Sequence, residues 1–205
     1  MGQPRGSSTE TKAEILGVAR DLFARQGLAA VSVRRVAAAA GVDHALVHRY
    51  FGTRDELIGA TIRAEVEAAS RRTGPEVETA DPRERIRRVL RYYLTEGRTS
   101  VLLVARAELA GLAPEALLAP GAPRALGLVT DELASLQAQG SRPRHDPALL
   151  GAVAGAALMG FVTVAPWLMT GVGLAPEDFE ARLDEIVDIV VDLLADPDTR
   201  GMAPD

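Results

Sequence analysis

The sequence predicts an all-α protein with a small helical domain followed by a larger one. Ala, Leu, Arg and Glu dominate the 205 residues and favour helix, whereas aromatic residues account for only 4% and runs of β-branched residues are few. Apolar residues recur at intervals of three and four, which is the spacing of one helix face. The chain has no cysteine, which excludes a disulfide framework, a thiolate zinc site and a cysteine nucleophile.

The N-terminal part is expected to hold three short helices after a polar arm. Residues 1–10 lack an apolar run, so we predict a disordered arm and expect no secretory signal. Thr11 and Glu14 have the spacing of a capping box, which starts a first helix that ends at Gly27. Two further helices are predicted, from the N-caps Ser32 and Asp43 to about residues 40 and 51.

The rest of the chain is predicted to contain six more helices, which makes about nine in all. Segments rich in glycine and proline separate them, at 73–75, 111–121 and 140–143. The predicted helices span residues 55–72, 81–96, 100–109, 123–139, 147–170 and 176–195. This pattern predicts one helical domain over residues 11–54 and a second over residues 55–205.

One long segment carries no charge. Residues 147–176 contain no Asp, Glu, Lys or Arg, and 149–169 are long enough to cross a bilayer. Against a membrane span stand three glycines, Pro166 and a low density of Leu, Ile and Phe. A helix rich in small residues and packed against a partner has the same composition. We therefore expect a cytoplasmic protein that does not enter the membrane, with a membrane-anchored protein as the alternative.

Residues 32–51 have the layout of a helix-turn-helix. Gly41 occupies the turn, where a positive φ is favoured, and Ala37 is small enough to let the two helices approach closely. An ordinary corner between two helices has the same layout. The polar outward face favours the DNA-binding interpretation; it carries His44, Leu46, His48 and Arg49, with Arg34, Arg35 and Arg54 beside them.

Residues 11–57 resemble the DNA-binding region of TetR/AcrR-type transcriptional regulators. The matching stretches are Ile15-Leu16, Ala19, Leu22-Phe23, Gly27, Ser32-Val33-Arg34, Val36-Ala37, Ala40-Gly41-Val42 and Tyr50-Phe51-Gly52-Thr53-Arg54-Asp55-Glu56-Leu57. The resemblance implies an N-terminal three-helix DNA-binding domain and a larger C-terminal helical domain that binds ligand and forms a dimer. It also implies that the last two helices make the dimer as a four-helix bundle.

The resemblance assigns roles to single residues. It implies that Ser32 caps its helix and contacts phosphate, and that Asp43 is the N-cap of the recognition helix. His48 stands where the family commonly has tyrosine, and Arg54 replaces a lysine that anchors phosphate. The full predicted set of DNA-binding residues is Ser32, Arg34, Arg35, Asp43, His44, Ala45, Leu46, His48, Arg49, Tyr50, Thr53 and Arg54.

The charge distribution agrees with double-stranded DNA as a partner. The net charge of the chain is −5, which by itself argues against a polyanionic partner. Residues 1–54, however, contain eight basic and four acidic residues, which gives +4 and leaves −9 for the remainder. A local basic face is enough to neutralise phosphates and release counterions.

The larger domain is expected to hold a small apolar effector and the dimer interface. The candidate ligand-binding residues are Tyr92, Tyr93, Met159, Phe161 and Trp167, of which Trp167 follows a proline that would kink its helix. Core packing alone also explains any one of them. The candidate dimer residues, assigned through the family resemblance, are Gly151, Gly155, Gly160, Ile186, Val190 and Leu194.

Other arrangements of chemical groups carry less weight. His44 and His48 are four residues apart, but Asp43 is the only nearby candidate for a third ligand, so we expect no metal and no cofactor. We also expect no enzymatic activity. The arginine-rich run at 83–91 is interpreted as a solvated helix face, with packing toward the DNA-binding domain or pairing with acidic residues as the alternatives. The sequence thus predicts a ligand-responsive, one-component transcriptional regulator, in this family more often a repressor, that binds a palindromic operator as a homodimer. A membrane-anchored regulator and a helical protein–protein adaptor are the alternatives.

Overall fold

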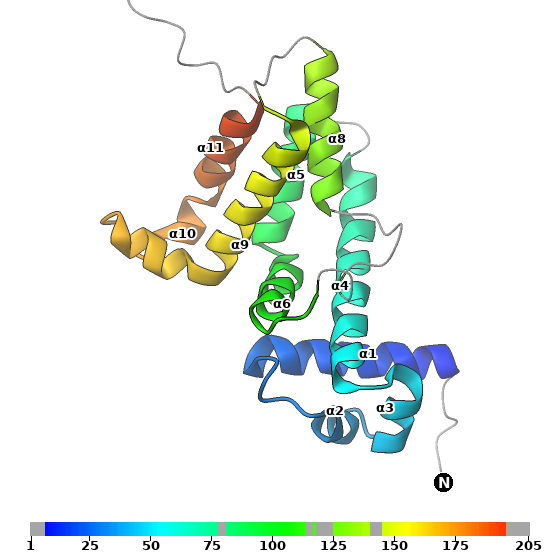
Figure 1. Ribbon diagram of the computed structural model, residues 1–205. Helices are drawn as coiled ribbons and strands as arrows, with labels where there is room; N and C mark the ends of the chain where they lie inside the picture. The colour runs from blue at the N-terminus through cyan, green and yellow to red at the C-terminus, as the bar shows by residue number, and fades with distance from the viewer. Residues whose placement is uncertain (1–6, 78–80, 114–116, 118–124, 140–144, 196–205) are drawn as a thin grey trace, which may run out of the picture. The chain divides into compact units, whose positions relative to one another are not determined.

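The computed structural model describes residues 7–77, 81–113, 117, 125–139 and 145–195, and all regular structure within these ranges is helical (Figure 1). The chain forms two compact units. The N-terminal unit comprises residues 1–68 and 102–122, and the C-terminal unit comprises residues 69–101 and 123–205. These bounds differ from the predicted division at residue 54, because a later helix returns to pack in the N-terminal unit.

The N-terminal unit is built around one apolar core. It contains α1 (Ser8–Gln26), α2 (Val33–Ala39), α3 (His44–Phe51), the first part of α4 (Arg54–Val77) and the second part of α6 (Arg98–Leu109). Phe23, Val36 and Val47 bring α1, α2 and α3 together in this core, and Leu103 adds α6 to it. The core therefore holds the two short helices at a fixed angle to the longer ones.

Helix α1 begins earlier than its predicted capping box. Ser7 is the N-cap: its hydroxyl accepts from Glu10 N at 3.3 Å, and Glu10 Oε2 accepts from Ser7 N at 2.6 Å. The prediction that Thr11 and Glu14 form this box was wrong, and residues 8–10 are helical rather than part of a disordered arm. Two capping boxes lie four residues apart in the sequence, and the helix uses the first. The rest of the predicted arm lies outside the described residues.

Two arginines bind backbone carbonyls inside the N-terminal unit. Arg106 on α6 donates to the carbonyls of Phe23 and Ala24, both at 2.7 Å, in the last turn of α1. Arg54 at the start of α4 donates to Val31 O at 3.1 Å and to Leu28 O, in the loop between α1 and α2. Carbonyls in the last turn of a helix and in loops often need donors from outside the helix, and Arg106 supplies one to Ala24 O and a second one to Phe23 O, which also accepts from Gly27 N.

The C-terminal unit is a helical bundle. It contains α5 (Pro82–Leu94), α8 (Ala125–Ala138), α9 (Pro147–Gly171), α10 (Asp178–Ala181) and α11 (Leu183–Ala195). Helix α5 packs against α8, α9 and α11, and α8 packs against α9 (Figure 1). The unit is held by buried residues from each helix, among them Leu90, Leu133, Leu158 and Val187.

Helix α9 is kinked near its middle. Val164 has non-helical dihedral angles, with φ −132° and ψ 20°, and Pro166 follows two residues later. Proline has no N–H to donate to the carbonyl four residues back, which is that of Val162. Arg98 donates to that carbonyl at 3.1 Å, so an arginine side chain supplies the missing hydrogen bond.

Three arginine–aspartate pairs join α5 to α11. Arg83 pairs with Asp192 at 3.3 Å, Arg87 pairs with Asp188, and Arg91 pairs with Asp184. We call this set the α5–α11 ladder. Of the interpretations of the arginine-rich run, pairing with acidic residues therefore holds for three of its members, which bind the acidic face of α11. Their side chains remain about half exposed, so each pair contributes little on its own, about 0–1 kcal/mol.

The predicted helices are present with different ends, and the described residues hold ten helices rather than nine. The additional helix arises because the predicted segment 176–195 is divided at Arg182, which has φ −105° and ψ 13°. The predicted loop at 73–75 is also wrong, since α4 continues to Val77 and the Thr73 hydroxyl donates to Ala69 O one turn back. The predicted linker at 140–143 and most of the predicted loop 111–121 lie outside the described residues.

Candidate nucleic-acid interface

Helices α2 and α3 form a helix-turn-helix whose parts are fixed by local hydrogen bonds. The Ser32 hydroxyl accepts from Arg35 N at 3.2 Å, and Asp43 Oδ1 accepts from Ala45 N at 2.7 Å, so both predicted residues are N-caps. Gly41 lies in the turn with φ +65°, in the left-handed region that a glycine adopts without a Cβ penalty. Val42 N donates to Ala37 O at 3.0 Å and closes the turn.

Helix α3 presents a polar face to solvent and one valine to the core. His44, Ala45, His48 and Arg49 are exposed, while Val47 is 1% exposed. The two histidine rings meet edge to face, with centroids 6.3 Å apart. The first turn of α3, which carries the predicted DNA-binding residues His44, Ala45 and Leu46, is therefore accessible to a partner. Leu46, the third residue of that turn, is half-buried.

The orientation of the His48 ring follows from its hydrogen bond. Nδ1 lies 2.8 Å from the carbonyl oxygen of Gly52, which can only accept a hydrogen bond. Nδ1 therefore carries the proton, and Nε2 is left for solvent or a ligand. Neutral His48 thus offers an acceptor at Nε2, and it can donate to a phosphate only when the ring is protonated.

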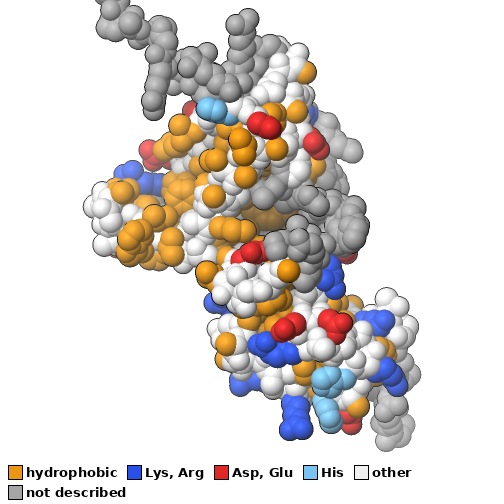
Figure 2. Space-filling model, viewed as in Figure 1, with side chains coloured by type: hydrophobic (Ala, Val, Ile, Leu, Met, Phe, Trp, Pro, Cys, Tyr) orange, Lys and Arg blue, Asp and Glu red, His pale blue; other side chains and the backbone are white. Residues whose placement is uncertain are grey.

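The basic residues beside α3 differ from most of those in the C-terminal unit in how they are paired. Arg34 and Arg35 on α2 are exposed and have no carboxylate partner among the described residues. By contrast, all five arginines of α5 form ion pairs with Asp or Glu. Figure 2 shows Lys, Arg and His side chains on the visible surface of the N-terminal unit. Unpaired exposed cations on α2 are available to bind phosphate.

Two of the predicted DNA-binding residues, Thr53 and Arg54, also have structural roles. The Thr53 hydroxyl accepts from Glu56 N at 3.2 Å and caps α4, while Glu56 Oε2 accepts from Thr53 N at 2.6 Å. These hydrogen bonds lower the pKa of Glu56, and the one from the Thr53 backbone has the largest effect. The guanidinium of Arg54 is occupied by the carbonyls of Leu28 and Val31, which the sequence does not suggest. A phosphate contact by Arg54 stays a prediction.

Lys12 is a basic residue near α3 that the sequence pattern does not single out. Its Nζ lies 5.1 Å from the ring centre of Tyr50, and the guanidinium carbon of Arg49 lies 5.6 Å from the same centre. Lys12 is the only lysine in the sequence. The sequence shows only that a basic residue lies in the second turn of the first helix. The contact between Lys12 and Tyr50 depends on tertiary packing, so the sequence alone does not reveal it.

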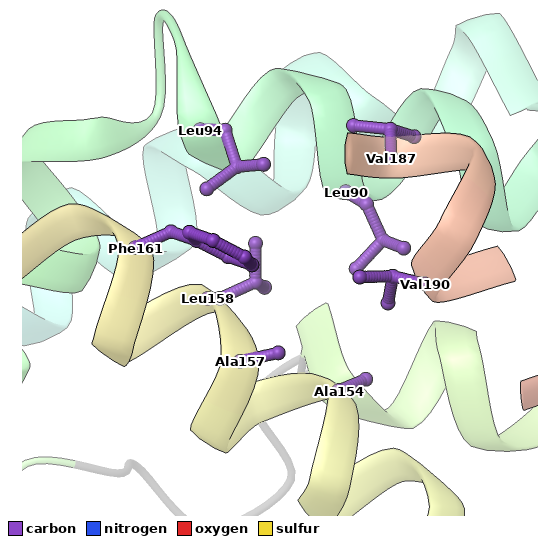
Figure 3. Close-up of a pocket in the computed structure, with 8 residues that line it drawn as sticks. All are labelled: Leu90, Leu94, Ala154, Ala157, Leu158, Phe161, Val187 and Val190. Carbon is purple, nitrogen blue, oxygen red and sulfur yellow. The ribbon is translucent and has the colours of Figure 1, made fainter. Parts of the chain in front are cut away.

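A small cavity in the C-terminal unit is lined by apolar side chains only. Its volume is about 10 Å³, and Figure 3 shows its lining residues, which come from α5, α9 and α11 and point toward one another. They are Leu90, Leu94, Ala154, Ala157, Leu158, Phe161, Val187 and Val190. Of the five predicted ligand-binding residues only Phe161 lines this cavity.

The other four predicted ligand-binding residues lie elsewhere. Tyr93 is buried, and burial raises its pKa to about 12; Tyr92 packs edge-on against it, with ring centroids 5.2 Å apart. Met159 is half-buried on α9. Trp167 is 73% exposed, because the kinked part of α9 directs it away from the unit's core.

Part of the predicted dimer interface is buried within the chain itself. Gly151, Gly155 and Leu194 face the unit's own core, and Val190 is half-buried and lines the cavity, so the part of these residues in a dimer interface stays a prediction. Ile186 and Gly160 are half-buried. Helix α9 carries small or apolar residues on two nearly opposite sides, about 160° apart at 100° per residue, so its composition does not decide which side packs inward. The chain packs the side with Gly151 and Gly155 inward.

A row of residues on the other side of α9 faces outward. It runs along the helix at steps of three and four residues and is apolar or small throughout. We call it the α9 stripe; its members are Leu149, Val153, Ala156, Gly160, Val164 and Trp167. Ile189 and Leu193 on the neighbouring α11 are 52% and 68% exposed. Figure 2 shows apolar side chains gathered over α9.

The described residues bear on the metal and membrane alternatives. No group of three or more metal-ligating side chains occurs within the described ranges. One helix, Pro147–Gly171, is long and apolar enough to cross a membrane by length and composition, and 39% of its most apolar window is buried in the structure. The buried core helix of a soluble protein meets the same criteria.

The chain is similar in sequence to known regulators over its N-terminal quarter. It is 53% identical over 53 residues to an HTH-type transcriptional repressor of Mycobacterium tuberculosis. These 53 residues are 26% of this chain. The match spans only 28% of the length of that curated relative. The shared segment is thus about the size of the α1–α3 region.

Solved structures share the fold over nearly the whole chain. AibR in complex with isovaleryl coenzyme A and operator DNA has a TM-score of 0.62 at 19% identity and covers 90% of this chain and 98% of its own. FadR from Bacillus subtilis in complex with stearoyl-CoA has a TM-score of 0.68 at 16% identity and covers 90% and 97%. Residues 15–61 match the family described as bacterial regulatory proteins, tetR family. The N-terminal region of the chain thus matches the tetR family of bacterial regulatory proteins, and nearly the whole chain shares the fold of these solved structures.

Proposed function

We propose that this protein is a cytoplasmic transcriptional repressor that binds a palindromic DNA operator as a homodimer and responds to a small apolar effector. The observation that carries the proposal is the exposed face of α3, flanked by the unpaired cations of α2. Helix α3 has eight residues and is about 12 Å long, which suits a major groove about 12 Å wide.

Each residue of this face has a role in the proposal. Arg34 and Arg35 bind phosphates, which positions the helix without reading sequence. His44 contacts a base edge, and Ala45 packs against a thymine methyl group. Replacement of His44 therefore changes the preferred sequence, whereas loss of either arginine weakens binding to all sequences.

The homodimer in the proposal forms through the α9 stripe and the exposed face of α11. A two-fold interface uses the same surface on both subunits, so it must be self-complementary. The stripe carries no charge, and its small residues Ala156 and Gly160 allow two copies of α9 to approach closely. Two recognition helices related in this way would contact half-sites about 34–36 Å apart, or a multiple of that spacing.

The effector in the proposal binds between α5, α9 and α11. The cavity there is apolar but holds about one water molecule, whereas ligand pockets usually measure about 300–1,000 Å³. An effector must therefore separate these helices in order to enter. Because α9 and α11 also carry the proposed dimer surface, this separation would move one subunit against the other and alter the spacing of the two recognition helices.

The test begins with selection of genomic fragments bound by the protein, followed by fluorescence anisotropy over a range of salt concentrations. We expect Arg34→Gln/Arg35→Gln to lower the slope of log K against log salt by about 2, since each phosphate contact contributes about 0.9. The matched control is Arg71→Gln/Arg72→Gln, an equal change of charge on exposed α4 positions. An unchanged slope in the first variant contradicts the contact assignment. Failure to enrich any duplex contradicts DNA binding and favours an adaptor.

A further inference from the structure

Two cations from different helices converge on one tyrosine at the end of the recognition helix. Lys12 comes from α1, and Arg49 and Tyr50 come from the last turn of α3. The Nζ of Lys12 and the guanidinium of Arg49 lie 5.1 and 5.6 Å from the ring centre of Tyr50, both within cation–π range. Like charges repel, so bringing them to one ring favours an anion that can share them.

Neither cation is neutralised by the protein. Lys12 and Arg49 are exposed and have no carboxylate partner among the described residues. Glu10 is the nearest acidic residue on the N-terminal side of Lys12 in α1. Its carboxylate accepts a hydrogen bond from the backbone N–H of Ser7. The cluster therefore presents a net positive charge to solvent.

Hydroxyl groups complete the cluster. The pKa of Tyr50 lies below its ordinary value, chiefly through a hydrogen bond from the Ser8 hydroxyl and further through the charges of Arg49 and Lys12. The Tyr50 and Ser8 oxygens thus lie within hydrogen-bond reach of each other. Because the Ser8 hydroxyl donates to the Tyr50 oxygen, the Tyr50 O–H is left to donate, and together with the two cations it matches the acceptor oxygens of a phosphodiester.

We propose that Lys12, Arg49, Tyr50 and Ser8 form a seat for one backbone phosphate of duplex DNA. This proposal rests on the proposed DNA-binding function and adds a contact from α1. The position of the cluster suits this contact, because the first turn of α3 reads bases and its last turn lies about 6 Å further along the helix axis, toward the edge of a major groove about 12 Å wide. The phosphate at that edge bridges α1 and α3 and fixes how deeply α3 enters the groove.

The first experiment measures the salt dependence of binding to a mixed-sequence DNA duplex of about 30 base pairs, because a phosphate contact does not depend on sequence. We expect Lys12→Gln to lower the slope of log K against log salt by about 0.9, so that the loss of affinity between about 50 and about 200 mM salt is smaller by about 3.5-fold. Lys12→Arg keeps the charge and restores the slope. The matched control, Arg25→Gln, removes an exposed cation from the other end of α1 and leaves the slope unchanged.

The second experiment uses the fact that Lys12 is the only lysine. An amine-reactive acetyl ester modifies Lys12 and the α-amino group, and peptide mass spectrometry separates the two. We expect the same duplex to slow acetylation of Lys12 several-fold in the wild-type protein. Protection of Lys12 together with a changed slope supports the seat.

The outcomes separate the two proposals. If the wild-type protein binds the duplex but Lys12→Gln keeps its slope and Lys12 is acetylated equally fast with and without DNA, the seat is refuted and the DNA-binding function stands. If the wild-type protein binds no duplex, both are refuted. Lys12 and Arg25 both lie at exposed positions of α1. Gln has a helix propensity close to that of Lys and Arg, so folding is retained in the variants at these positions.

Discussion

Substitution of Arg106 by alanine is expected to destabilise the N-terminal unit. Its guanidinium donates to the carbonyls of Phe23 and Ala24 at 2.7 Å each, in the last turn of α1. A hydrogen bond to a charged group contributes about 1.5–3 kcal/mol. In the variant, Phe23 O keeps a second donor, Gly27 N at 3.0 Å, so the free energy lost with the Arg106–Phe23 hydrogen bond is smaller. We expect a total of about 2–3 kcal/mol.

This free energy corresponds to a measurable change in thermal stability. For chains of about 150–250 residues, 1 kcal/mol shifts the Tm by about 2–4 °C, so Arg106→Ala should lower it by about 5–10 °C. Circular dichroism at 222 nm follows the loss of helix, and amide hydrogen exchange shows whether α1 loses protection first. The control is Glu108→Ala, an exposed position on the same helix, which should change the stability by less than about 0.5 kcal/mol. If the Tm of Arg106→Ala stays within about 1 °C of the wild type, the two hydrogen bonds do not stabilise the unit and the reasoning is refuted.

Three further predictions concern the dimer and the titrating groups. Ala156→Arg, in the α9 stripe, should give a monomer by light scattering, while Ala134→Arg on exposed α8 should stay dimeric; a dimeric first variant would remove the stripe from the interface. The pKa of Glu56 is lowered in the fold, so its capping contribution is present above its ordinary pKa of 4.5 and is lost as the pH falls through the folded pKa. Thermal unfolding from about pH 7 to about pH 3 should therefore show a smaller difference between wild type and Glu56→Gln at the acidic end, and a constant difference would contradict this. Burial raises the pKa of Tyr93 to about 12, so ultraviolet titration should find it ionising after Tyr50, with stability falling as the pH rises above 10; the reverse order would exclude the buried site.

The local chemistry of the helix-turn-helix could be predicted from sequence because its determinants are close together in the chain. Ser32 and Asp43 cap helices that begin at the next residue, and Gly41 meets the need for a positive φ in the turn. Each of these depends on atoms within a few residues. The same holds for the start of α5, where Asp81 accepts from Arg83 N and Glu84 N.

Features that depend on tertiary partners were harder to predict from the sequence. Both sides of α9 carry apolar or small residues at helical spacing, and its packing against α5 and α8 decides that Gly151 and Gly155 point inward. The basic character of Arg54 suggests a phosphate ligand, whereas the fold also uses it to bind two loop carbonyls more than twenty residues away. Charge and periodicity describe what a side chain can do, and the three-dimensional neighbours determine which of these it does.

The α5–α11 ladder has a consequence for how far α11 can slide. Its arginines and its aspartates both repeat every four residues, in opposite directions along the two helices. A displacement of α11 by four residues, about 6 Å, re-forms two of the three pairs, whereas a displacement by two residues aligns none. We therefore expect α11 to move in discrete steps of about one helical turn, because the positions between these steps align none of the pairs. Spin labels on exposed positions of α5 and α11 should then give separate distance populations rather than one broad distribution.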